Sequence, residues 1–94
     1  MGITKHDKIA KEIAAKKGTE YHSDKGIDIK TSTQAIEIEV DSSKFNEGVR
    51  QLQGTNKTRY LAVPNKLVKE AIDYTEETGV GIMNEHGKIK KRGS

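Results

Sequence analysis

The chain has no cysteine and no tryptophan, and it contains only one phenylalanine and three tyrosines among its 94 residues. Without cysteine there are no disulfides, thiolate metal sites or cysteine nucleophiles, which fits a reducing compartment. So few aromatic rings argue against a platform that stacks single-stranded bases. There is no apolar run of membrane-spanning length and no signal-peptide core. We therefore expect a cytoplasmic protein that does not engage a membrane.

Charged residues are plentiful, and they slightly favour the positive sign. Lysine and arginine number 17 against 14 acidic residues, giving a net charge of +3. A balance of this size permits nucleic-acid binding and is equally typical of an ordinary lysine-rich protein. Because hydrophobic residues make up only 32% of the chain, we expect a lean core. The length predicts a single domain over residues 1–94.

Periodicity predicts alternating helices and short strands. Thr4 is a candidate N-cap for the first helix and Gly18 its end, while Asp41 and Asn65 are candidate caps for later helices. The expected helices start near residues 4, 45 and 65, and the expected strands cover 19–22, 27–30, 35–40, 59–63, 80–83 and a short piece near 89. Residues 23–26 are of types that favour a turn. We expect strands 27–30 and 35–40 to form a hairpin, and strands 59–63 and 80–83 to be the parallel members of a right-handed βαβ unit.

The most informative segment is 36–41, where isoleucine or valine alternates strictly with an acid. A period of two predicts a strand with one buried and one wet face, and the wet face would carry Glu37, Glu39 and Asp41. Asp28 lies between two isoleucines of the preceding strand. Like charges on neighbouring strands cost stability, so a divalent cation is one explanation. The alternative is a solvated strand face, with Asp41 as a helix cap.

Taken with these acids, the order of elements resembles the PD-(D/E)XK nuclease superfamily, which includes restriction endonucleases and archaeal Holliday-junction resolvases. Asp28 matches the first motif acid, Ile38-Glu39-Val40 the second, and Gln51 the helical glutamine. The resemblance implies an α/β fold with a restriction-endonuclease-like α-β-β-β-α-β-α-β core, in which helices flank a mixed sheet.

The resemblance also implies a site and its chemistry. Asp28, Glu39 and the Val40 carbonyl would hold Mg²⁺ or Mn²⁺, with Asp41, Glu37 and Gln51 assisting catalysis. The basic residues expected to bind DNA phosphates are Lys30, Lys44 and Arg50. The chain departs from the family at the motif lysine, whose place is taken by Asp41 or, in the register Glu37-X-Glu39, by Glu39.

Three functions follow as hypotheses. The first is a metal-dependent nuclease acting on DNA, with branched DNA as a candidate substrate, and working as a homodimer because so small a domain offers little surface to a duplex. The second is a catalytically inactive nuclease-fold module that binds DNA or protein, which the missing lysine favours. The third is an assembly module without a nucleic-acid role.

For Glu12, an ion pair with Lys8 or Lys16 is favoured over a place in the site, and the histidines lack zinc-ligand spacing.

Overall fold

The computed structural model describes residues 4–22 and 27–93, so the turn predicted at 23–26 lies outside the described residues. The chain forms a mixed α/β domain with a five-stranded sheet. Its helices are α1 (Lys5–Lys16), α2 (Phe45–Leu52) and α3 (Val68–Tyr74), with single 3₁₀ turns at Ser42–Lys44 and Asn65–Leu67. Its strands are β1 (Ile29–Lys30), β2 (Gln34–Ile38), β3 (Thr58–Ala62), β4 (Gly81–Met83) and β5 (Ile89–Lys91).

The strands lie in chain order across the sheet, β1-β2-β3-β4-β5. β1 and β2 form the predicted antiparallel hairpin, with Ile29 opposite Ile36. β2, β3 and β4 are parallel to one another, and β5 returns antiparallel to β4. The parallel pairing predicted for the βαβ unit is therefore confirmed. The three parallel strands also bring their carboxyl ends to one edge of the sheet.

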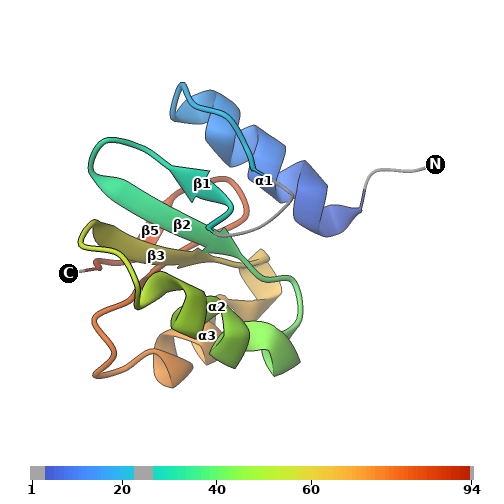
Figure 1. Cartoon of the computed structure of the whole chain (residues 1–94). Coiled ribbons are helices and arrows are strands. Elements are labelled where there is room, and N and C mark those ends of the chain that lie inside the picture. The colour runs from blue at the N-terminus through green and yellow to red at the C-terminus, as the bar shows by residue number, and fades with distance from the viewer. Residues whose placement is uncertain (1–3, 23–26, 94) are drawn as a thin grey trace.

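Helices cover both faces of this sheet (Figure 1). On one face, α1 packs its buried residues Ile9 and Ile13 against Ile36 and Ile38 of β2. On the opposite face, α2 and α3 pack against a second cluster that includes Leu61 and Ile82. Because both faces are covered, the central strands are buried on both sides, as the apolar run at 59–63 predicts. Among the described residues, no helix combines the length and apolar character needed to cross a bilayer.

Local chemistry explains where α1 begins and ends. The Asp7 backbone N–H donates to Thr4 Oγ1 at 3.1 Å, which confirms Thr4 as the N-cap. Gly18 follows the helix with a φ of +68°, a left-handed conformation that glycine adopts without strain. The caps fix both ends of α1. Its stripe of His6, Ile9 and Ile13 faces the sheet.

Two local predictions are wrong. Asn65 makes no side-chain cap, since the 3₁₀ turn before α3 starts after Pro64 without one, and the Asn65 N–H instead donates to Glu85 Oε1 at 3.0 Å. The segment predicted as a strand at 19–22 contributes only one isolated bridge, between Tyr21 and Ile29. At both places the backbone is held by a residue outside the segment, Glu85 for Asn65 and Ile29 for Tyr21. The secondary-structure propensity of the segment itself does not reveal such contacts.

Candidate functional site

Asp28 and Glu37 meet at the open end of the β1–β2 hairpin. Ile29 pairs with Ile36, so the antiparallel register places the residue before β1 opposite Glu37. The Asp28 N–H donates to Glu37 Oε1 at 2.9 Å, and the Ile38 N–H donates to Asp28 Oδ2 at 3.0 Å. The side chains of Asp28 and Glu37 thus extend the hydrogen bonding of the hairpin beyond its paired strands. These bonds hold both carboxyl groups in place.

The prediction that Glu37 lies on a wet strand face is wrong. Its side of β2 is covered by the cluster that α2 and α3 complete, and Glu37 is only 6% exposed. Burial, and next the charge of Asp28, raise the pKa of Glu37 to about 8. Desolvation penalises the charged form of a carboxyl group, so Glu37 keeps its proton at neutral pH unless a cation compensates its charge.

Glu39 lies on the same side of the strand and packs against α2 at Gly48. A β-carbon at position 48 would come within 3.0 Å of Glu39 Cγ and 3.2 Å of its Oε2, so glycine allows this close approach. Partial burial raises the pKa of Glu39 to about 7, His6 opposes the rise, and the Asp28 charge adds to it. The charges of Asp28 and Glu39 therefore oppose each other, while the shared metal site expected of these two residues stays a prediction.

His6, from the first turn of α1, is the basic side chain in contact with Asp28. Its Nε2 lies 3.2 Å from Asp28 Oδ2. The Tyr21 hydroxyl donates to Asp7 Oδ1 at 2.7 Å and lies 3.2 Å from His6 Nδ1. The hydrogen bond to Asp28 is the main cause that raises the pKa of His6. Sequence reasoning missed His6, although its position one turn before Ile9 continues the apolar stripe of α1 and marks it as facing the sheet.

Other predicted site residues follow β2 or lie on α2. Asp41 caps the following 3₁₀ turn, accepting from the Ser43 N–H and hydroxyl at 3.0 Å each, so its alternative role as a cap is confirmed. Val40 is partly buried and packs with the α1-side core. Gln51 is exposed on α2, where it lines a shallow hollow with Glu47 and Arg50.

The predicted phosphate-binding residues are all exposed: Lys30, Lys44 and Arg50. Lys44 Nζ lies 3.5 Å from Glu47 Oε2. The charge of Lys44 also partly opposes the rise in the pKa of Glu39. Throughout residues 4–22 and 27–93, no lysine forms an ion pair with Asp28, Glu37 or Glu39. Glu12 pairs with Lys16 at 3.2 Å, which confirms its prediction as a helical ion-pair residue.

A metal ion needs ligands that the fold brings together. Within the described part of the chain, no group of three or more histidine and acidic side chains is arranged to hold a metal ion. Mg²⁺ typically takes one or two carboxylates and completes its shell with water and substrate phosphate. The Mg²⁺ or Mn²⁺ ligation expected of Asp28 and Glu39 therefore stays a prediction.

Comparisons of this chain with family models, with curated proteins and with solved structures gave no match.

Proposed function

We propose that this chain is a nuclease domain that hydrolyses DNA phosphodiesters with Mg²⁺ or Mn²⁺ held by Asp28 and Glu39. The observation that carries the proposal is the hairpin register, which fixes Asp28 against Glu37 and leaves its charge acting on Glu39. Like charges on neighbouring strands and a buried carboxyl group both cost stability. A divalent cation compensates such charges, and the order of acids agrees with the nuclease resemblance.

Each residue of the cluster has a task in this proposal. A bound divalent ion lowers the pKa of a water molecule and stabilises charge on the reacting phosphate. Asp28 and Glu39 hold the ion, and the Val40 carbonyl is the proposed third protein ligand. Glu37 lies beneath Asp28 and fixes its backbone. His6 holds the Asp28 carboxylate from the other side, so the position of Asp28 does not depend on the ion.

A second candidate is a nuclease-fold module that binds DNA without cleaving it. It is favoured by the absence, among the described residues, of a lysine paired with the acids. In this case His6 would be the permanent partner of Asp28. For either candidate we expect a homodimer, since a domain of 94 residues presents little surface to a duplex.

The two candidates are separated by a nicking assay on supercoiled plasmid and on a four-way junction, with Mg²⁺ or Mn²⁺ and with EDTA. The wild-type protein is expected to nick only with metal. Asp28→Asn keeps an acceptor for the Ile38 N–H but loses the charge, and it is expected to reduce cleavage by at least a hundredfold. Asp73→Asn is the matched control, because Asp73 is an exposed carboxylate on α3.

Metal-independent nicking, or equal activity of Asp28→Asn and Asp73→Asn, would contradict the nuclease proposal. Salt-sensitive DNA binding without cleavage at any metal concentration would establish the second candidate. Binding by neither protein nor variant at low salt would leave only an assembly role.

A further inference from the structure

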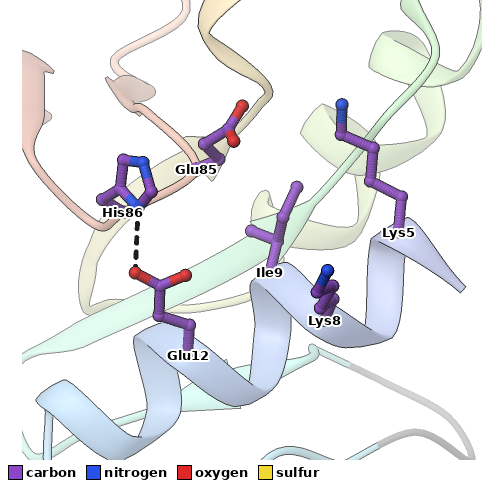
Figure 2. A pocket seen from close by; sticks show the side chains of 6 residues that line it. All are labelled: Lys5, Lys8, Ile9, Glu12, Glu85 and His86. Carbon is purple, nitrogen blue, oxygen red and sulfur yellow. Dashed lines mark hydrogen bonds and ion pairs between the residues drawn. The ribbon is translucent and has the colours of Figure 1, made fainter. Parts of the chain in front are cut away.

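A hollow of about 600 Å³ lies between α1 and the turn that joins β4 to β5, and it is not part of the acid cluster. Its lining residues are Lys5, Lys8, Ile9, Glu12, Glu85 and His86. Figure 2 shows the α1 side chains along one wall and Glu85 and His86 along the other. Ile9 is buried and forms an apolar part of the lining between the charged groups.

The acids of this hollow already have partners. Glu12 Oε2 accepts from His86 Nδ1 at 2.9 Å and lies 3.2 Å from Lys16 Nζ. Lys16 also donates to the His86 carbonyl at 3.0 Å, which fixes the turn against α1. Glu85 Oε1 accepts the Asn65 N–H at 3.0 Å. The acids of the two walls thus help hold the hollow together, Glu12 through His86 and Glu85 through the Asn65 backbone.

The lysines of the hollow have no such partners. Lys5 and Lys8 are exposed, and neither forms an ion pair or side-chain hydrogen bond within the described residues. Three residues apart on a helix, they are neighbours on its surface. Both reach the hollow (Figure 2). Lys5 and Lys8 therefore offer positive charges without an ion-pair partner among the described residues, while Glu12 is paired and Glu85 is held by a backbone N–H. The lysines suit an anion.

The hollow and the acid cluster share one edge of the domain. The turn carrying Glu85 and His86 follows the carboxyl end of β4, and Glu39 follows the carboxyl end of the parallel strand β2. Lys5 is adjacent in sequence to His6, whose Nε2 contacts Asp28. A polynucleotide lying along this edge would meet both places.

We propose that the hollow binds a backbone phosphate of DNA, next to the phosphate that the acid cluster addresses, with Lys5 and Lys8 as its cationic contacts. The placement beside a second phosphate rests on the proposed function. The phosphate contact itself depends only on the lysines. Contacts of this kind position the DNA without reading its sequence, so the hollow would raise affinity for every DNA alike.

The test measures binding of a fluorescent duplex by anisotropy over a range of salt concentrations, without divalent metal. Lys5→Gln/Lys8→Gln is compared with Lys11→Gln/Lys69→Gln, which removes the same charge from exposed lysines outside the hollow. Each lost phosphate contact lowers the slope of log affinity against log salt by about 0.9. We expect a slope smaller by about 1.8 and binding weaker by at least about tenfold at 0.1 M salt for the hollow variant only.

Equal weakening of the two double variants would overturn the inference, because the lysines would then act only through net charge. Failure of the wild-type protein to bind the duplex would overturn it as well. If the hollow variant alone loses slope while the wild-type protein cleaves no DNA with Mg²⁺ or Mn²⁺, the nuclease proposal fails and the phosphate contact stands. Circular dichroism of each variant confirms that binding is compared between folded proteins.

Discussion

Replacing Glu37 by glutamine should change how the stability of this protein depends on pH. The buried carboxyl group has a pKa of about 8 against an ordinary value of 4.5. At a pH between these two values, Glu37 therefore keeps its proton in the folded state and has lost it in the unfolded chain. A pKa raised by folding contributes stability that is complete below the unfolded value and is lost as the pH rises through the folded one.

The size of the effect follows from this linkage. Each pH unit between the two pKa values removes about 1.4 kcal/mol from the free energy of unfolding. From pH 5 to pH 7 the wild-type protein should lose about 3 kcal/mol on this account, a large part of the stability of a small domain. Glutamine is nearly isosteric and keeps an acceptor for the Asp28 N–H, so Glu37→Gln should remove the share of the slope that Glu37 contributes and be the more stable protein at pH 8.

Urea denaturation at half-unit pH steps from 5 to 8.5 measures both proteins. Glu39 and His6 also have raised pKa values, so they add slope of the same sign and remain in the variant. Glu76→Gln, at an exposed position after α3, is the matched control and should follow the wild-type profile. Parallel profiles for wild type and Glu37→Gln would refute the buried proton.

Three further substitutions test the packing that positions the site, each by urea denaturation at one pH. Thr4→Ala leaves the Asp7 N–H without its cap and should cost about 1 kcal/mol. Gly48→Ala places a methyl group 2.7 Å from Leu61 Cδ1 and 3.0 Å from Glu39 Cγ, and it should cost about 1 kcal/mol net, since overpacking outweighs the better helix propensity. Leu61→Ala opens a cavity in the core beside Glu37, its neighbour on β2, and should cost about 2–5 kcal/mol. A stabilised Gly48→Ala or a neutral Leu61→Ala would contradict the described packing.

Local sequence patterns predict much of this fold because each depends on near neighbours. α2 was expected from the spacing of Phe45, Val49 and Leu52, and it spans Phe45–Leu52. The hairpin follows from two short alternating runs separated by a polar turn, and the parallel pairing of β3 and β4 from the helix between them. In each case the periodicity of one segment and the length of its connection determine the outcome.

The environment of Glu37 could not be predicted in this way. Alternation shows that one face of β2 is apolar, but it does not reveal what covers the other face. Here α2 and α3 cover it, so a carboxylate expected in water is buried. His6 reaches Asp28 only because α1 crosses the sheet at this end, an arrangement set by packing between segments far apart in sequence. The sequence singles out Asp28 and Glu37, which the structure brings into contact, but it does not reveal the burial of Glu37 or the contact of His6 with Asp28.

A crystal structure of the protein soaked in Mn²⁺ at pH 8, with anomalous data, tests the central proposal most directly. We predict one anomalous peak within coordination distance of both the Asp28 and Glu39 carboxylates, and none in crystals of Asp28→Asn. An open, fully ordered site without a peak, or the same peak in the variant, would contradict the proposal.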